Sequence, residues 1–287
     1  MTHTCPICLS DSDLLPAGVR GDGQTVWKCR TCSSGMIQHV FTLDEDPKSY
    51  SADYFSEHPS YFNALEAQVS DPNNLGNMIL DRLSLRRPLP GKHLLDVGTA
   101  SGLLPAVAKR RGLDAVGLDI SEYACTQARA QLGIHAVCGT LLNHPFHAGD
   151  FDIITMMDVI EHLPQPRPAV AEAARLLKPE GLLAIMTPNF SSHRVWGDRW
   201  HGYQASYEHL YYFNRKGLSR LLMDTGFQVL SSETFAMVDL LPYYFPNLYR
   251  HLPGGFANRL GRFLSNKILR PLQLEHRLLV TARKAGT

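Results

Sequence analysis

The chain has 287 residues, 44% of them hydrophobic, and is therefore long enough for one large domain or two smaller ones with a full core. Its formal net charge of +1 gives no whole-protein argument for binding nucleic acid or an anionic membrane. The N-terminus lacks a basic segment followed by an apolar stretch, and no run of about 18 apolar residues occurs, so we expect neither a secretion signal nor a membrane span. The expected location is the cytoplasm.

Four of the six cysteines form two Cys-x-x-Cys pairs, Cys5 with Cys8 and Cys29 with Cys32. This spacing is typical of four thiolates around one tetrahedral zinc ion. Two disulfides or a redox dithiol are the alternatives, but neither a secretion signal nor a thioredoxin-like strand and helix accompanies the pairs. We predict a zinc ribbon over residues 1–40, with a strand in "TVWKC", and a structural role for the metal because so small a unit has almost no core. The remaining cysteines are expected to be buried free thiols: Cys125 and Cys138.

Residues 41–90 are polar and are predicted to form a helical connector and cap. The stretch "YSADYFSEHPSYF" is rich in aromatic residues. The stretch "NMILDRLSLRR" has the pattern of a helix, which Pro88 and Pro90 would end.

Strands and helices alternate from residue 93 onward. Such alternation predicts an α/β fold in which helices cover both faces of a parallel, doubly wound Rossmann-like sheet. Two further strands, "FQVLSSETF" and "HRLLVTARK", follow near the end of the chain. The other predicted strands are 93–97, 114–119, 134–138, 151–157 and 181–187, and the predicted helices are 102–111, 121–132, 165–177 and 214–225.

The stretch "HLLDVGTASGLL", residues 93–104, reads as a strand, a tight turn and a helix. A dinucleotide-binding turn needs Gly-x-Gly-x-x-Gly, whereas this turn has Gly98, Ala100 and Leu103 at those positions. Asp119 ends the second predicted strand, where a carboxylate can accept two ribose hydroxyls. Because no pyrophosphate cradle is present, the pattern favours an adenosine that carries something other than phosphates.

Six segments in the expected order resemble the class I S-adenosylmethionine (SAM) dependent methyltransferases. They are "LLDVGTASG", "VGLDIS", "HPFHAGDFDIITMMDVIEHL", "LLKPEGLLAIMTPN", "EHLYYFNRKGLSRLLMDTGF" and "LLVTARK", between residues 93 and 284. Within that superfamily the chain is most similar to ubiquinone-pathway O-methyltransferases and, because of its ribbon, to zinc-containing deoxysugar C-methyltransferases. The resemblance implies a seven-stranded sheet with an antiparallel last strand over residues 91–287.

The resemblance also implies the residues that bind SAM. Asp119 would hold the ribose hydroxyls, and Ile120 would lie against the adenine. Ala100 departs from the family's middle glycine, and Thr140 or a neighbour stands where the family has an acidic residue near the adenine. Met157 and Asp158 would face the sulfonium, and the turn would line the methionine and ribose through Asp96, Gly98, Thr99, Ala100, Ser101 and Gly102. A turn-capping carboxylate at Asp96 and a helix N-cap at Ser101 are compatible alternatives.

Methyl transfer from a sulfonium is an in-line displacement, so the protein aligns the reactants, excludes water and removes a proton if the acceptor is weakly acidic. "MDVIEHLP" places Asp158, Glu161 and His162 at helical spacing near the donor methyl. A similar set in ubiquinone-type enzymes is implicated in holding a divalent cation. The alternative is that Glu161 and His162 only brace the following helix.

Residues 188–214 are dense in aromatic side chains, which favours a lid or a pocket wall. Within them "YEHLYYF" resembles the segment of sugar C-methyltransferases that surrounds the substrate. By that resemblance His209 would be the general base, Glu208 would orient it and Tyr207 would lie nearby, with His162 as a further catalytic candidate. A packed core histidine is the alternative for His209. Tyr54 and Tyr61 of the connector are further candidates to close over the donor.

Residues 240–274 contain no Asp or Glu and carry several Arg and Lys residues between apolar ones. This basic amphipathic insertion suggests peripheral contact with an anionic membrane or with a phosphorylated substrate. The alternative is a helix that packs its apolar face on the protein and leaves its charges in water.

The function expected from the sequence is methyl transfer to a small molecule: a sugar nucleotide, a lipid-linked glycan, a quinone or a secondary metabolite. The first alternative is an RNA methyltransferase whose ribbon binds the substrate. Near-neutral charge, few cations in the ribbon and "TPNF" in place of the motif of amino-directed base methyltransferases argue against it. The second alternative is a non-catalytic SAM-binding module fused to a zinc adaptor.

Overall fold

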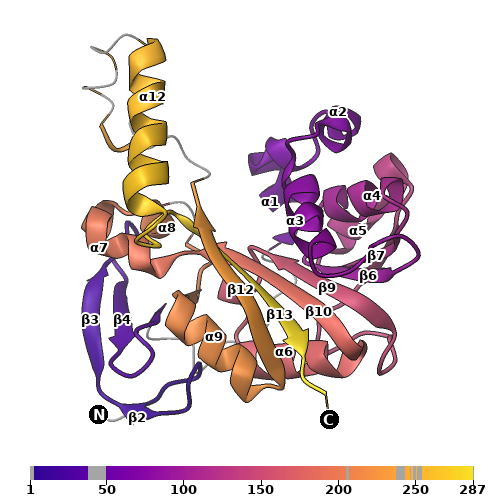
Figure 1. The fold of residues 1–287 in the computed structure, drawn as a ribbon, viewed down its shortest axis with the longest axis horizontal. Coiled ribbons are helices and arrows are strands. Elements are labelled where there is room, and N and C mark those ends of the chain that lie inside the picture. Colours follow the sequence, from indigo (N-terminus) through magenta and orange to yellow (C-terminus); the bar gives the residue numbers. More distant parts are fainter. Residues whose placement is uncertain are drawn as a thin grey trace.

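A seven-stranded mixed sheet forms the centre of the structure, a computed structural model that describes residues 3–37, 50–204, 207–236, 243–245, 247, 250 and 254–286 (Figure 1). The strand order is β12-β13-β10-β9-β6-β7-β8. β13 runs antiparallel to both of its neighbours, and the other described pairs are parallel. The Rossmann-like class and the antiparallel last strand are thus confirmed. The strands are β6 (His93–Val97), β7 (Asp114–Asp119), β8 (His135–Cys138), β9 (Phe151–Met157), β10 (Leu177–Pro188), β12 (Phe227–Phe235) and β13 (Arg277–Lys284).

Two hydrophobic cores lie on the two faces of this sheet. Leu94 of β6 belongs to the core beneath α3, α4 and α5, and its neighbour Leu95 belongs to the core beneath α6 and α9. Such strands, buried on both faces, are typical of doubly wound sheets. Asn74, Ser121 and Asn214 begin α3, α5 and α9, because their side-chain oxygens accept backbone N–H groups of the first turn. The helices are α3 (Leu75–Ser84), α4 (Leu103–Arg110), α5 (Glu122–Leu132), α6 (Pro166–Leu176) and α9 (Arg215–Asp224).

The two isolated cysteines differ in exposure. Cys125 of α5 is buried, as expected, whereas Cys138 is exposed. The prediction was wrong for Cys138 because β8 is an edge strand of the sheet and Cys138 is its last residue.

The ribbon forms a second sheet, which a distant part of the chain completes. Its order is β11-β5-β4-β3, and β11 (Tyr211–Tyr212) comes from the segment that follows β10. The predicted strand "TVWKC" is confirmed as β4. Val26 and Met36 belong to the same core as the leucines of α9. The ribbon strands are β1 (His3–Thr4), β2 (Asp11–Ser12), β3 (Leu14–Val19), β4 (Thr25–Cys29) and β5 (Gly35–Ile37).

The connector is helical where the structure describes it, and residues 38–49 lie outside the described part. The hydroxyl of Ser121 donates to the carbonyl of Tyr50 at 2.6 Å, which ties the start of this segment to the sheet. Arg110 of α4 pairs with Glu66 at 2.7 Å. The short helices of the connector therefore lie on the side of the sheet that carries α3, α4 and α5 (Figure 1). They are α1 (Ala52–Glu57), η3 (Pro59–Tyr61) and α2 (Leu65–Ser70).

The aromatic segment after β10 is made of short helices. Trp200, Tyr203, Tyr212 and Phe213 are fully buried in the core that the ribbon shares. The elements are η5 (Phe190–Ser192), α7 (His193–Trp196), η6 (Gly197–Arg199) and α8 (His201–Gln204).

The basic insertion contains helix α12 (Gly254–Leu264), which projects away from the sheet (Figure 1), and the π-helical turn η7 (Ser265–Leu269). The predicted insertion also includes positions 240–242, 246, 248, 249 and 251–253, which lie outside the described residues. Among the helices that are described, none combines the length and the apolar character needed to cross a membrane.

Replacement of Gly217 tests the contact between α9 and the ribbon. A Cβ atom at Gly217 would lie 1.9 Å from Ser34 Oγ, so Gly217→Ala should lower the melting temperature although alanine favours helices by about 1 kcal/mol. In a Ser34→Ala background, Gly217→Ala should lower the melting temperature less, or raise it, because the Ser34 hydroxyl is absent. Thermal unfolding of the four proteins in this cycle measures the coupling, and strictly additive melting temperatures would contradict the contact.

Candidate active site

A cavity of about 700 Å³ lies at the carboxyl ends of β6, β7 and β9. β6 is bonded to β7 on one side and to β9 on the other, so the cavity lies where the strand order reverses, the usual ligand position in such sheets. Of the fourteen residues that the sequence proposed as SAM-binding or catalytic, eleven line the cavity: Asp96, Gly98, Thr99, Ala100, Ser101, Asp119, Ile120, Met157, Asp158, His162 and Glu208. Gly102, Tyr207 and His209 are not among the lining residues.

The turn after β6 needs its two glycines. Gly98 and Gly102 have φ angles of 67° and 78°, and an added Cβ would lie 2.3 Å from Val159 and 2.4 Å from Ile134, respectively. Ala100, between them, has a φ of 46°, so its methyl group is accommodated in the left-handed region. Gly102, not Ser101, is the N-cap of α4, and Ser101 faces the cavity instead.

Asp96 braces this turn from below. Its carboxylate accepts the hydroxyls of Thr99 at 2.9 Å and Thr155 at 2.7 Å. Burial raises the pKa of Asp96 to about 7, although the two hydroxyls oppose the shift. The side chain therefore ties β6 to β9 beside the cavity.

Asp119 ends β7 and crosses to the same turn. Its two oxygens accept the backbone N–H groups of Ala100 at 2.8 Å and Ser121 at 2.9 Å. Burial raises its pKa, and these two hydrogen bonds oppose the shift. A carboxylate oxygen has a second lone pair, so both oxygens can still accept hydroxyl groups from a ligand.

The far end of the cavity is largely apolar. Leu118 and Ile120 line it from β7 and its end, and Gly139, Thr140 and Leu141 follow β8. The Thr140 hydroxyl accepts the backbone N–H of Leu142 at 3.2 Å. A flat aromatic group would find apolar walls and one hydroxyl here.

Asp158 is held by a residue from the last strand. Its carboxylate forms an ion pair with the Arg277 guanidinium at the start of β13. Asp158 has a φ of 55°, and burial raises its pKa while Arg277 opposes that shift. The Asp158 carboxylate thus forms its ion pair with Arg277 while the residue lines the cavity.

Glu161, His162 and His209 form a buried cluster beside the cavity. One possible ligand atom from each of the three lies within 4.8 Å of the others. Glu161 is fully buried, accepts the Thr187 hydroxyl at 3.0 Å and lies 4.0 Å from His209 Nε2. Burial, and then the charge of Asp158, raises the pKa of Glu161 to about 8.

His162 links this cluster to the cavity. Its Nδ1 lies 3.1 Å from the Tyr50 hydroxyl, and its ring centroid lies 4.7 Å from that of His209. Burial lowers the pKa of His162 to about 4 and lowers that of His209 well below its usual value. Both imidazoles are therefore neutral at pH 7.

Neither His209 nor Tyr207 lines the cavity. The His209 ring is buried behind His162, and its centroid lies 6.0 Å from that of the Tyr212 ring. Tyr207 is 49% exposed, and its ring lies 5.7 Å from the guanidinium carbon of Arg20. The segment therefore presents Glu208 and Leu210, rather than these two rings, to the cavity.

The connector supplies the remaining wall. Tyr54 and Tyr61, which the sequence suggested for closing over the donor, line the cavity together with Tyr50 and Phe55. Their rings pack edge to face, with centroids 5.1 Å apart for Tyr50 and Tyr54 and 5.5 Å apart for Phe55 and Tyr61. These contacts place a preformed aromatic wall opposite the turn after β6.

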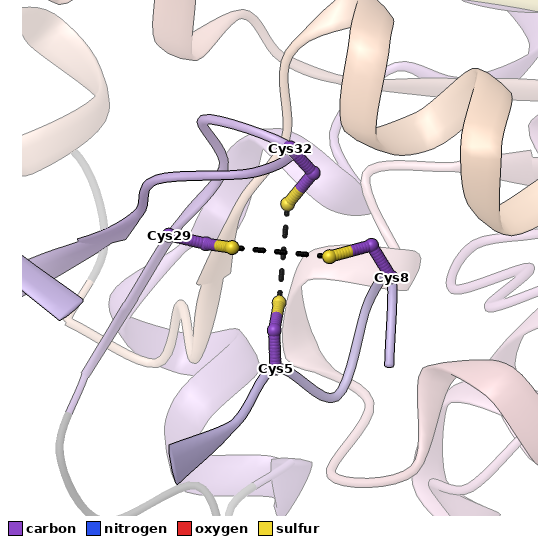
Figure 2. Close-up of side chains that lie close together, drawn as sticks. All are labelled: Cys5, Cys8, Cys29 and Cys32. Atoms are coloured by element: carbon purple, nitrogen blue, oxygen red, sulfur yellow. Dashed lines mark hydrogen bonds between the residues drawn. The ribbon is translucent and has the colours of Figure 1, made fainter. Parts of the chain in front are cut away.

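The four cysteines of the ribbon form a second site, remote from the cavity. Figure 2 shows their sulfurs converging on one point from two knuckles. The Cys5–Cys32 and Cys8–Cys29 sulfur pairs are each 3.8 Å apart. A tetrahedral ion with Zn–S bonds of about 2.3 Å separates its sulfurs by about 3.8 Å, so the four thiols fit zinc. The six cysteines are all free, which excludes the two disulfides.

Three contributors to these sites were not predicted from the sequence. Tyr50 was only part of an aromatic-rich stretch, Arg277 was only a residue of a strand, and Arg20 was only one of the few cations of the ribbon. Each acts through a partner more than 100 residues away in the chain. Only the density of aromatic residues after position 49 gave a signal for the first of them.

Comparison with known proteins adds the following. Residues 77–232, just over half of the chain, match the family described as a methyltransferase domain. A ubiquinone biosynthesis O-methyltransferase of Thiobacillus denitrificans is 33% identical over 144 residues, which are 45% of this chain and 61% of that relative. The matched region thus spans about three fifths of the relative's length.

Two solved structures are similar in fold. One is a chain in a complex between the Haloferax volcanii Trm112 methyltransferase activator and a methyltransferase, with a TM-score of 0.57, 18% identity, and coverage of 82% of this chain and 97% of that one. The other is an S-adenosylmethionine dependent methyltransferase from Mesorhizobium loti, with a TM-score of 0.53, 17% identity, and coverage of 75% and 100%. At these identities the likeness establishes the fold.

Glu161→Gln should change how stability depends on pH. Because the pKa of Glu161 is raised from 4.5 to about 8, its protonated form stabilises the fold fully below about pH 4.5, and this contribution is lost as the pH rises through 8. The amide cannot ionise, so the variant does not lose this contribution. Its free energy of unfolding relative to that of the wild type should therefore rise by more than about 1 kcal/mol between pH 5 and pH 8. Denaturant unfolding at both pH values measures the difference, and a constant difference would contradict the raised pKa.

Proposed function

Because the chain belongs to the methyltransferase domain family, we propose that it transfers a methyl group from SAM to a small-molecule acceptor. The observation that carries the proposal is the position of Asp119, which lines the cavity while its two oxygens accept the N–H groups of Ala100 and Ser121. A SAM-dependent methyltransferase of the same fold supports the choice of donor.

The residues around the cavity fit SAM as follows. The two free lone pairs of Asp119 would accept the ribose hydroxyls, and the apolar end near Leu118 and Ile120 would take the adenine. Thr140 would supply one polar contact there in place of a carboxylate. The methionine end would lie along the turn, over Gly98 and Ser101, towards Met157. When bound, SAM supplies the electrophilic methyl group.

The acceptor would enter from the side of Tyr50, His162 and Glu208, all of which line the cavity. We assign the proton-accepting role to His162 because of its position: it lines the cavity, and its Nδ1 lies 3.1 Å from the Tyr50 hydroxyl. Tyr50 orients the ring through its hydroxyl, and His209 and Glu161 stand behind it as positioning residues. The aromatic wall of the connector would exclude water from the reacting atoms.

A divalent cation is the alternative to proton transfer through His162, because an imidazole that binds a cation cannot also accept the proton. Glu161, His162 and His209 are the described side chains able to hold one beside the cavity. Asp158, expected in this set from the sequence, pairs with Arg277 instead. A bound cation would orient an acceptor with two adjacent oxygens and lower the pKa of a hydroxyl bound to it.

The zinc ion of the ribbon is assigned a structural role. Four cysteines would complete a tetrahedral zinc site, so no position is left open for a substrate. Zinc would therefore supply folding energy to the ribbon rather than chemistry.

A small-molecule acceptor is favoured over RNA. Arg20, one of the three cations of the ribbon, is buried in contacts within the protein and unavailable to phosphates. The ubiquinone biosynthesis relative points to a quinone-like acceptor as one member of the class.

Isotope transfer tests the acceptor class. The purified protein is incubated with SAM labelled in its methyl group and with fractionated cell extract, and labelled products are identified by mass spectrometry. We expect the label in a small molecule. Label in RNA would replace the proposed acceptor class, and absence of SAM binding by calorimetry would remove the proposed activity.

Asp119→Asn tests the donor site. The amide offers one acceptor oxygen and turns an NH₂ group toward a backbone N–H, so the affinity for S-adenosylhomocysteine should fall at least about tenfold. Asp114→Asn, at the exposed start of the same strand, is the matched control and should bind like the wild type. Calorimetry measures both, and equal affinities in the two variants would remove Asp119 from the site.

The basic insertion, residues 240–274, is the candidate surface for contact with a membrane. Phe263 and Ile268 are 55% and 44% exposed, and the neighbouring Arg262 and Lys267 are exposed too. We propose contact with an anionic membrane through this face.

Vesicle cosedimentation at low salt measures this contact. The protein should bind vesicles that contain phosphatidylserine, and the Arg262→Glu/Lys267→Glu variant should not. Lys28→Glu/Arg30→Glu makes the same charge change on the ribbon and should bind like the wild type. No binding of the wild type to anionic vesicles would remove the membrane from the list of partners.

A further inference from the structure

The segment 207–212 is held from two sides. On the inner side, the Leu210 N–H donates to the Glu161 carbonyl at 2.8 Å. On the outer side, the Ile37 N–H of the ribbon donates to the Leu210 carbonyl at 3.1 Å, and β11 pairs with β5 through Tyr211 and Tyr212. One short stretch therefore joins the ribbon to the cavity wall.

Arg20 is the side chain at the centre of this junction. It is only 2% exposed, and its Nη1 donates to the His209 carbonyl at 2.9 Å and to the Tyr212 hydroxyl at 3.3 Å. Asp22 pairs with the same guanidinium, and the Tyr207 ring lies beside it. A guanidinium can serve these directions at once because its five donors have a fixed planar arrangement.

The metal-binding knuckles determine where the ribbon side of the junction begins. Cys29 ends β4, and its N–H donates to the Ser34 carbonyl at 3.0 Å, one residue before β5 starts. Cys32 adds a direct contact, since its carbonyl accepts the Asn214 side chain at 3.2 Å. The second knuckle thus determines the position of β5, and β5 determines the position of β11 through their strand pairing.

We propose that the zinc ribbon positions the acceptor side of the cavity: through Arg20 and β5 it holds residues 207–212, and with them Glu208 and Leu210, in the cavity wall. Arg20 is a positioning residue, because its contacts are with the His209 backbone and with the side chains of Asp22, Tyr207 and Tyr212, and it does not line the cavity. The inference rests on the proposed function only in taking this wall as the acceptor side. The donor side, formed by the turn after β6, should be independent of the ribbon.

Hydrogen exchange tests the mechanical part of the inference without any acceptor. The zinc-loaded full chain is compared with Arg20→Ala and with Arg30→Ala, an exposed arginine of the same ribbon. In Arg20→Ala the amides of 209–212 should exchange at least about tenfold faster, while those of 96–102 stay unchanged. Arg30→Ala should match the wild type. Wild-type exchange of 209–212 in Arg20→Ala would overturn the inference.

Zinc content and ligand binding separate positioning from unfolding. Arg20→Ala should retain about one zinc ion per chain and bind S-adenosylhomocysteine within about twofold of the wild type. Its transfer of label from SAM to the acceptor fraction should fall at least about tenfold. Unchanged transfer would overturn the role in the acceptor wall. If the wild type binds no SAM, the proposed activity fails, but the exchange experiment still decides whether the ribbon holds the segment.

Two milder variants keep the test decisive if Arg20→Ala does not fold. Arg20→Lys retains the charge but not the planar fork, and Tyr212→Phe removes one acceptor of Arg20. Each should give exchange at 209–212 that is faster than in the wild type, with zinc retained. Wild-type exchange in both would overturn the inference.

Removal of zinc gives an independent result. Chelation should increase exchange in residues 3–37 and also in 207–212, but not in 96–102. Increased exchange confined to residues 3–37 would show that the ribbon is an independent module.

Discussion

The hydrogen bond between the Asp119 carboxylate and the Ala100 N–H is the constraint on which the proposed donor side of the cavity depends. It joins the end of β7 to the turn after β6, and the second oxygen joins the start of α5 to the same point. In this turn every second residue has a positive φ: Gly98, Ala100 and Gly102. Such a conformation persists only when neighbouring contacts hold it, and the Asp119 carboxylate supplies one of them. The ligand site and the local fold therefore share one carboxylate.

The two sides of the cavity are built in different ways. The proposed donor side consists of adjacent strand ends and their turns, so its geometry follows from the sheet. The proposed acceptor side is assembled from distant segments, with Tyr50 before the sheet, His162 after β9 and Glu208 after β10. In a family that shares one fold and acts on different acceptors, variation of this second side changes the substrate without changing the first.

The sequence predicted the parts of the structure that depend on local patterns. All seven strands of the central sheet and the turn at Gly98 appear where hydrophobic periodicity and glycine spacing put them, and the sulfurs of Cys5, Cys8, Cys29 and Cys32 converge as their spacing indicated. Such features depend on residues within one element or one knuckle. The positions of His209 and Arg277 could not be read in this way, because each is set by contacts with strands far along the chain.

The aromatic segment shows the same limit from the other direction. Its composition indicated a large contact surface, and Trp200 and Tyr203 do make one, but with the ribbon and the core rather than with the cavity. Composition alone does not specify which neighbour covers an apolar ring. The buried position of Arg20 has the same cause, since a lone arginine in a polar stretch carries no sign of its distant partners.

The pairing of β5 with β11 bears on how the chain matures during synthesis. β5 ends at Ile37, whereas its partner at Tyr211–Tyr212 leaves the ribosome only after most of the polypeptide has been made. Until then a metal-loaded ribbon would expose the unpaired edge of β5, and Arg20 would lack its partners His209 and Tyr212. An exposed strand edge promotes association with other nascent chains. Any shortened chain that ends before β11 would retain that open edge permanently.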